Sequence, residues 1–309
     1  MKKIILMMLA VALLAGCQQT TPNEEEAVVS AEQITTSNVE SARPPNLLNA
    51  FNKVVTEGTP YEAKVFLDKY MSTASELDAD IMLTMFVDQQ RDVLDGYTDL
   101  IFNTVYQNAL LDAYDKSYNL DKLSRDYSDE IMSFLEVVKQ DGFLLNYHEG
   151  MITLYPDYNL LQSYVPYVSE SIRAYVEILS RESSEILSAD GGLTISWEEL
   201  SFRVLSAEEY LVNYEDSIRY NEVFELYKWY LNALLTGLPD TPIYYRNSNL
   251  IRNDVLQSYN KVIIHNADTV TASVLTGYLD VIRSKNNKVD GDALTYVRDT
   301  LKNLDFTEY

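Results

Sequence analysis

The sequence predicts an all-α fold in which helical hairpins pack as an irregular bundle or a short solenoid, with one small β-hairpin near residues 143–155. Apolar side chains recur at spacings of three and four over most of the chain after residue 46, as on the buried face of a helix. The 309 residues include only 10 glycines and 8 prolines, too few for the many tight turns of a β-sandwich or a doubly wound α/β fold. Capping residues precede several of the periodic segments, so helices are the expected elements.

The first expected helices lie in an N-terminal helical half, residues 46–142. Thr59, Pro60 and Glu62 match an N-cap, a first-turn proline and the glutamate of a capping box, so a helix should begin there. We expect the helices of this half at about residues 60–71, 77–94, 97–114 and 129–139. Gly96 is expected to separate the second helix from the third, which should bury Leu100 and Val105.

The apolar period then changes to that of strands. Residues 143–148 and 151–155 read as two short strands around the turn Glu149-Gly150, closed by Pro156. A lone hairpin is only marginally stable, so it must lie on the helices. We expect it to open the second half of the folded part, residues 143–309.

The C-terminal half should contain six more helices, at about residues 169–187, 196–213, 219–235, 250–264, 268–283 and 290–304. Ser196 and Glu199 are spaced as a capping box, and Gly237 is placed to stop a helix ahead of an irregular segment at 238–245. The short loop 213–217, before the helix that carries Tyr227 and Tyr230, resembles the loops of tetratricopeptide-like and other α-solenoid hairpins. No fixed period recurs, so this resemblance concerns architecture alone.

The N-terminus has the pattern of an export signal. Lys2 and Lys3 precede an apolar stretch, residues 4–14, that is too short to span a bilayer. Leu14-Ala15-Gly16-Cys17 resembles the lipobox of bacterial lipoproteins at all four positions. The resemblance implies that residues 1–16 are removed as a signal peptide and that the sulfur of Cys17 receives lipid, including palmitate-type acyl chains. Several chains of this kind anchor a protein stably at a membrane.

The segment after the lipobox, residues 17–45, has the composition of a disordered acidic linker. The resemblance therefore places the folded part in the bacterial cell envelope, on the extracytoplasmic face of a membrane. Cys17 is the chain's single cysteine, so lipidation leaves no thiol for a disulfide, a metal site or a nucleophile.

Charge limits the possible partners. The chain has 47 acidic and 24 basic residues, a formal net charge of −23. This charge opposes binding to nucleic acid and attracts cationic peptides and basic protein patches.

The sequence offers few residues for catalysis. His148 and His265 are the only histidines, and neither lies in a zinc or triad motif, so we expect no metal and no cofactor. Carboxylates are abundant, and Glu198-Glu199 and Glu208-Glu209 are the candidates for a carboxylate-dependent cell-wall hydrolase. Residues 188–199 have the length of a calcium loop, but Leu193 stands where that loop needs glycine, which favours a Gly-Gly turn before a capped helix. Asp290 similarly reads as a helix N-cap.

Tyrosine is unusually frequent, with 24 in the chain. Most should rim the cores of amphipathic helices with their hydroxyl groups at the surface. Tyr158, Tyr244 and Tyr245 are expected in loops beside prolines, where they could bind a peptide or a glycan.

These observations favour a non-enzymatic, lipid-anchored, extracytoplasmic helical module that binds an envelope protein or peptide. One alternative is a lipoprotein that captures a cationic peptide or a glycan. The other is the carboxylate-dependent hydrolase.

Overall fold

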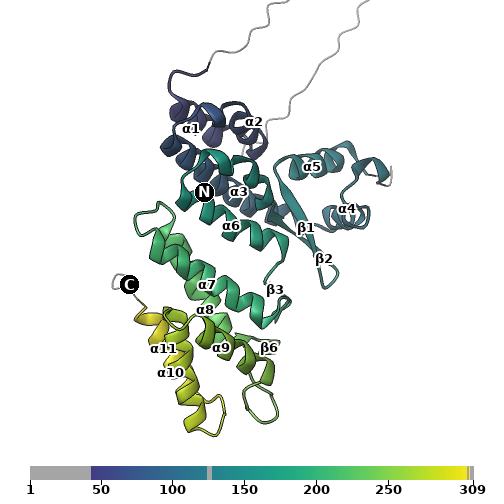
Figure 1. The fold of residues 1–309 in the computed structure, drawn as a ribbon. Coiled ribbons are helices and arrows are strands. Elements are labelled where there is room, and N and C mark those ends of the chain that lie inside the picture. The colour runs from purple at the N-terminus through teal and green to yellow at the C-terminus, as the bar shows by residue number, and fades with distance from the viewer. Residues whose placement is uncertain (1–42, 124–126, 305, 307–309) are drawn as a thin grey trace, which may run out of the picture. The chain divides into compact units, whose positions relative to one another are not determined.

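The computed structural model describes residues 43–123, 127–304 and 306, and the residues from Arg43 onward form one compact unit. Cys17 and the rest of the lipobox lie outside the described residues, as does the expected linker up to residue 42. Eleven α-helices and three two-stranded antiparallel sheets make up the described part, which confirms the mainly α-helical fold (Figure 1). No helix among these residues is both long enough and apolar enough to cross a membrane.

The first three helices pack against one another. They are α1 (Leu47–Glu57), α2 (Pro60–Tyr70) and α3 (Glu76–Ile101), with the 3-10 turn η1 (Met71–Thr73) after α2. The capping box of α2 is confirmed: the Thr59 hydroxyl accepts a hydrogen bond from the Glu62 amide at 3.2 Å, and the Thr59 amide donates to the Glu62 carboxylate at 2.9 Å. Helix α1, whose N-cap is Asn46, was not predicted from the sequence.

The expected break at Gly96 is wrong, because α3 runs through it to Ile101 and α4 (Thr104–Asp115) begins after the N-cap Asn103. A glycine inside a helix costs only about 1 kcal/mol. Packing of Tyr97 and Ile101 on a second core cluster keeps the helix intact. Leu100 and Val105 were expected to be buried. They are exposed, because α3 continues past Gly96 and the break falls between Ile101 and Thr104.

The second core cluster contains the predicted hairpin. β1 (Phe143–His148) and β2 (Met151–Pro156) pair antiparallel and pack with α4 and α5 (Asp129–Gln140). Glu149 and Gly150 both have positive φ, as a two-residue primed turn requires, so the predicted hairpin and its turn are confirmed. Its apolar side chains therefore lie mainly with the helices that precede it in sequence.

The remaining elements follow in chain order from residue 158. They are η3 (Tyr158–Tyr167), α6 (Glu170–Ser184), β3 (Ser188–Ala189), β4 (Gly192–Leu193), α7 (Trp197–Asn213), α8 (Tyr220–Thr236), β5 (Gly237–Leu238), β6 (Thr241–Pro242), α9 (Asn253–His265), α10 (Val270–Ser284) and α11 (Gly291–Lys302). Successive helices pack in pairs: α6 on α7, α7 on α8, α9 on α10 and α10 on α11 (Figure 1). The expected stop at Gly237 is confirmed, since this residue is the C-cap of α8 with φ of 73°.

Tyrosines fill the larger core cluster. Six of them are almost completely buried, namely Tyr175, Tyr210, Tyr227, Tyr230, Tyr259 and Tyr278. Three of these bury their hydroxyl groups as well: the Tyr227 hydroxyl lies 3.1 Å from that of Thr271, Tyr259 donates to the carbonyl of Leu234, and Tyr278 donates to the carbonyl of Leu235 at 2.7 Å. Both carbonyls belong to the last turn of α8, where helix carbonyls lack intrahelical partners. The expectation of surface hydroxyls is therefore wrong for these three tyrosines, and Tyr259 and Tyr278 act as caps inside the core.

Candidate functional site

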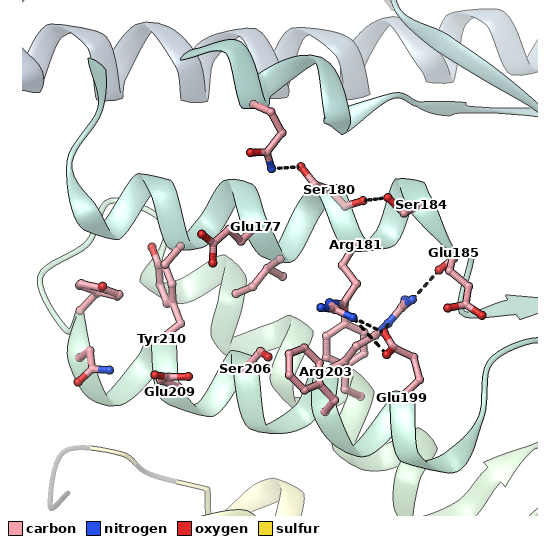
Figure 2. A pocket seen from close by; sticks show the side chains of 17 residues that line it. Glu177, Ser180, Arg181, Ser184, Glu185, Glu199, Arg203, Ser206, Glu209 and Tyr210 are labelled. Carbon is pink, nitrogen blue, oxygen red and sulfur yellow. Dashed lines mark hydrogen bonds and ion pairs between the residues drawn. The ribbon is translucent and has the colours of Figure 1, made fainter. Parts of the chain in front are cut away.

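A groove runs between the neighbouring helices α6 and α7 (Figure 2). It has a volume of about 650 Å³, within the range of ligand-binding pockets. Its walls combine two arginines with carboxylates, aromatic rings and small polar groups such as Ser180 and Ser206.

Arg203 lies beneath this groove with only 1% of its side chain exposed. Its guanidinium donates to the carboxylate of Glu182 at 2.5 Å, to the carboxylate of Glu199 at 2.9 Å and to the backbone carbonyl of Glu185 at 2.6 Å. Burial disfavours the charged guanidinium, but Glu182 and Glu199 outweigh this effect and raise its pKa. Arg203 is thus a fully partnered cation that holds α6 and α7 together.

The second arginine of the groove is also paired. Arg181 donates to both carboxylate oxygens of Glu199 at 3.2 Å, and its guanidinium lies over the ring of Phe202, 4.2 Å from the centroid. Glu199 therefore binds two arginines. The expected capping box is only half formed, because the Ser196 hydroxyl accepts from the Glu199 amide while the Glu199 carboxylate turns to the arginines.

Three more carboxylates line the groove without a cation. Glu177, Glu185 and Glu209 are exposed, and no ion pair joins their side chains to another described residue. Since Arg181 and Arg203 are already neutralised by Glu199 and Glu182, these three carboxylates give the groove an excess of negative charge. Figure 2 shows Glu177 on α6 and Glu209 on α7 near one end of the groove.

Aromatic side chains complete the wall. Tyr230 donates to the carboxylate of Glu182 at 2.6 Å and is buried. Burial raises the pKa of Tyr210 to about 12, and its hydroxyl lies 2.5 Å from that of Ser217. Phe202 is 47% exposed and presents an apolar face at the opening. The groove therefore offers apolar and hydrogen-bonding surface beside uncompensated carboxylates.

The tyrosines singled out in the sequence do not line this groove. Tyr158 begins η3 instead of lying in an exposed loop, and only 8% of it is exposed. Tyr244 is half-buried against the larger core cluster, and Tyr245 is 45% exposed. The expected loop position is wrong for Tyr158, and no described contact joins it to Tyr244 or Tyr245.

The four candidate catalytic carboxylates have separate environments. Glu198 pairs with Lys261 on α9, and Glu199 binds the two arginines. Glu208 is buried and accepts hydrogen bonds from the amides of Val270 and Thr271 and from the Thr271 hydroxyl, so it caps the start of α10. Of the four, only Glu209 is left with an unpaired carboxylate. These contacts give no convergent pair of acids.

The calcium-loop candidate folds as a turn. Asp190 and Gly191 have positive φ and connect β3 to β4, after which Ser196 caps α7, as the Gly-Gly turn interpretation predicts. Asp290 caps α11, also as predicted. His148 lies 3.8 Å from the Asp190 carboxylate, and His265 is the last residue of α9. Among the described residues, no group of three or more histidine, cysteine, aspartate or glutamate side chains is arranged to hold a metal ion.

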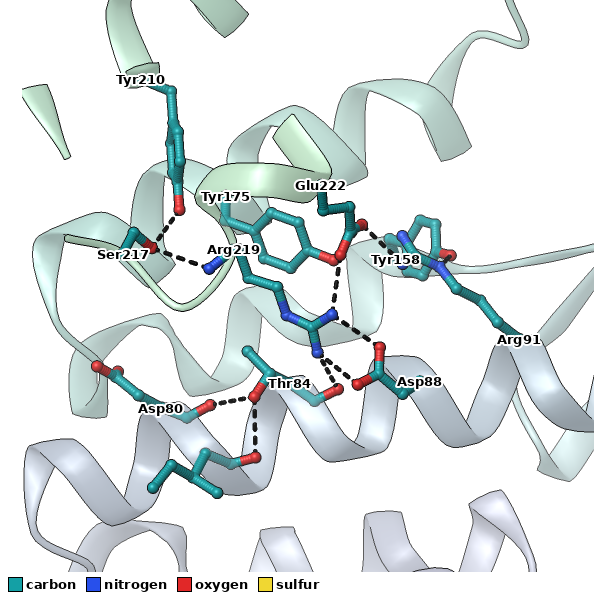
Figure 3. A network of polar contacts seen from close by, with 11 residues as sticks. Asp80, Thr84, Asp88, Arg91, Tyr158, Tyr175, Tyr210, Ser217, Arg219 and Glu222 are labelled. Carbon is teal, nitrogen blue, oxygen red and sulfur yellow. Dashed lines mark hydrogen bonds and ion pairs between the residues drawn. The ribbon is translucent and has the colours of Figure 1, made fainter. Parts of the chain in front are cut away.

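A polar network joins the start of α8 to α3 and α6 (Figure 3). Arg219 binds Asp88 of α3 and Glu222 of α8, and Glu222 also accepts from Arg91 at 2.6 Å and from the Tyr175 hydroxyl at 2.7 Å. The Tyr158 hydroxyl accepts from Arg91 at 2.9 Å. This network fixes helices that are more than 100 residues apart in sequence.

The two arginines, Glu177 and Glu185 were not among the residues predicted from the sequence. Arg203 occupies a position on the apolar face of its helix, between Leu200 and Ala207, and this unusual placement of a charge was the available signal. Comparison of the chain with protein-family models, with curated proteins and with solved structures finds no match.

Proposed function

We propose that this protein is a lipid-anchored interaction module of the bacterial cell envelope that binds a basic segment of a protein or peptide in the groove between α6 and α7. The observation that carries this proposal is the charge of the groove. Both of its arginines are neutralised within the protein, whereas Glu177, Glu185 and Glu209 have no cation partner among the described residues.

The chemistry of the groove favours a basic peptide over a single metal ion. The unpaired carboxylates lie on two helices and along the length of the groove, so they suit several lysine or arginine side chains of one segment. Phe202 and Tyr214 add aromatic surface, which can receive the aliphatic stems of those side chains or stack with guanidinium groups. The net charge of −23 would also speed the approach of such a partner.

The proposed location follows from the N-terminal sequence. Leu14-Ala15-Gly16-Cys17 resembles a lipobox, and a lipidated Cys17 would hold the folded part at the extracytoplasmic face of a membrane. A partner in the envelope is consistent with this position. The groove binds the partner, and the anchor determines where they meet.

Peptide binding can be tested by titrating a labelled, lysine-rich decapeptide without aromatic residues and measuring fluorescence anisotropy. The double variant Glu177→Gln/Glu209→Gln should weaken binding about tenfold, and added salt should weaken binding to the wild type. Glu136→Gln, an exposed glutamate on α5 outside the groove, is the matched control and should bind as the wild type does. Equal affinity for the wild type and the double variant would disprove the proposed groove.

The anchor needs a separate test. Cross-linking of intact cells followed by purification should recover a protein partner with the wild type, and membrane fractionation should release the Cys17→Ala variant from the membrane. If Cys17→Ala remains in the membrane fraction, the proposed lipidation is wrong, whatever the groove binds.

A further inference from the structure

A second pocket lies on the other side of α6, and its chemistry differs from that of the groove. Its volume is about 520 Å³, and it is lined by the ends of β2 and α6, the start of η3, and α8, together with Arg91 of α3. Its apolar wall is formed by Tyr155, Pro156, Tyr158, Leu179, Ile186, Leu226 and Trp229.

The charged side chains of this pocket are already paired. Arg91 and Glu222 form an ion pair at 2.6 Å, and Glu225 pairs with Lys228 at 2.7 Å. Glu182 is neutralised by Arg203, which lies beneath the neighbouring groove. A charged ligand would have to compete with these pairs, so the pocket favours an uncharged one.

Two aromatic rings of the pocket are open to a ligand. Trp229 is 42% exposed, and its ring contact among the described residues is with Tyr230, tilted by 46° at 5.5 Å. Tyr155 is half-buried and stacks on no described ring. By contrast, the ring of Tyr158 already lies under the Arg91 guanidinium, 5.7 Å from it. Trp229 and Tyr155 therefore provide aromatic surface that another ring can cover by offset or edge-on stacking.

The rest of the pocket wall is uncharged and largely apolar. Burial raises the pKa of the Tyr155 hydroxyl, with Asp157 and Tyr114 contributing in the same direction, and this phenol is neutral at physiological pH, as an ordinary tyrosine is. Leu179 is nearly fully buried, and Leu226 and Ile186 are half-buried around it. Such a mixture of apolar walls and a few fixed polar groups is typical of sites for small organic groups.

We infer that this pocket binds an uncharged aromatic ring, stacked on Trp229 and Tyr155 and supplied either by a free small molecule or by an aromatic side chain of a peptide. The site is separate from the basic-segment groove, because the two pockets contact different residues of α6. An aromatic ring gains contact with both open rings. A sugar would find few free hydrogen-bonding partners, and an organic cation would find the carboxylates of the pocket already paired with cations of the protein.

The test uses the full mature chain and follows the indole N–H signal of Trp229 by nitrogen-edited NMR. Trp229→Phe assigns the signal, since Trp197 is the only other tryptophan. The probes are 4-methylphenol as a free ring and N-acetyl-tyrosine amide as a capped side chain. Methyl glucoside tests whether the pocket prefers a sugar, and tetramethylammonium tests whether it prefers an organic cation.

We expect both aromatic probes to shift the Trp229 signal in a saturable way and Trp229→Ala to weaken their binding at least tenfold, as measured by saturation-transfer NMR. Tyr245→Ala removes a similarly exposed aromatic side chain that lines neither pocket, so it should bind like the wild type. Tighter binding of the capped amide would identify a peptide source, and tighter binding of 4-methylphenol a small-molecule source.

The inference is overturned if neither ring binds, if Trp229→Ala binds them as well as the wild type, or if methyl glucoside or tetramethylammonium binds more tightly. Circular dichroism should show that Trp229→Ala is folded, as expected for a change at an exposed residue. These probes carry no positive charge apart from tetramethylammonium. Their result is therefore independent of the basic-segment groove.

Discussion

The guanidinium of Arg219 makes two parallel hydrogen bonds to the carboxylate of Asp88, at 2.8 and 2.7 Å, across 131 residues of sequence. The same guanidinium donates to the carbonyl of Thr84 at 2.7 Å and to Glu222 at 2.8 Å (Figure 3). Planar, bidentate recognition of this kind is specific to arginine. One side chain thus determines where α8 begins relative to α3.

Replacing Arg219 by methionine should destabilise the protein by about 2 kcal/mol. The change keeps the aliphatic stem but leaves Asp88 and the half-buried Glu222 without this cation, and partial exposure of both carboxylates limits the cost. Urea denaturation measures the free energy of unfolding. Arg298→Met, an exposed arginine paired with its neighbour Asp299, should change stability by less than about 0.5 kcal/mol. Equal effects of the two substitutions would contradict the role of Arg219.

Glu208→Gln should lower the free energy of unfolding by about 2 kcal/mol, because an amide nitrogen would replace one of two buried oxygens that accept hydrogen bonds from Val270 and Thr271. Glu209→Gln is the matched control, one residue away but exposed, and should leave stability nearly unchanged. The stabilities of the two variants and of the wild type can be compared by thermal denaturation. A stable Glu208→Gln variant would show that this carboxylate does not cap α10.

Asp141→Asn should remove a pH dependence of stability. Burial raises the pKa of Asp141, although hydrogen bonds from Tyr97 and the Tyr61 amide partly oppose it. A carboxyl whose pKa is raised on folding binds more protons in the native state, so its contribution is present below its ordinary value of 3.8 and is lost as pH rises through the raised value. Urea denaturation from pH 3 upward should show the wild type losing stability relative to Asp141→Asn over this range.

Asp254→Asn is a control, because the pH dependence of stability that it removes has the opposite sign. Hydrogen bonds from Arg252 lower the pKa of Asp254, so its contribution is present above 3.8 and is lost as pH falls. Identical pH profiles for wild type and Asp141→Asn would refute the predicted shift. The two variants together distinguish the effect of burial on the pKa of a carboxyl from the effect of an ion pair.

Gly237→Ala should destabilise the protein by about 2 kcal/mol or more. Gly237 has φ of 73°, and an added Cβ would lie 2.3 Å from the carbonyl oxygen of Thr241, a backbone atom that cannot turn away. Gly291→Ala is the control, because a Cβ there meets nothing within 4 Å and the residue opens α11, so the same change should be neutral or stabilise by about 0.5 kcal/mol. Differential scanning calorimetry should show a lower melting temperature for Gly237→Ala than for Gly291→Ala. Similar melting temperatures of the two variants would contradict the prediction.

Gly237 and Gly96 were both expected to end a helix, and only Gly237 does so. Gly237 stops α8 because the backbone conformation at that residue is one that glycine alone adopts easily. Gly96 does not stop α3, because the core cluster beyond it receives Tyr97 and Ile101. The capping box of α2 and the β-hairpin were predictable because they depend on neighbouring residues. Helix continuity at Gly96 depends on packing that no local pattern contains.

The candidate site was harder to predict for the same reason. Glu199 was interpreted through Ser196, three residues away, but its carboxylate binds Arg181, 18 residues away. Likewise, Tyr158 was expected in an exposed loop, but its hydroxyl accepts a part-buried hydrogen bond from Arg91, 67 residues earlier. Tertiary partners decide whether a glutamate or a tyrosine is free to bind, and sequence periodicity does not reveal those partners.

The tyrosines that close the last turn of α8 also constrain the order in which the chain can fold. The carbonyls of Leu234 and Leu235 obtain their donors from α9 and α10, segments that follow them in sequence. Because synthesis proceeds from the N-terminus, α8 is made before either donor is available. The end of α8 therefore becomes stable only when α9 and α10 have been made and have packed against it, and a chain cut after residue 236 would fray at that end.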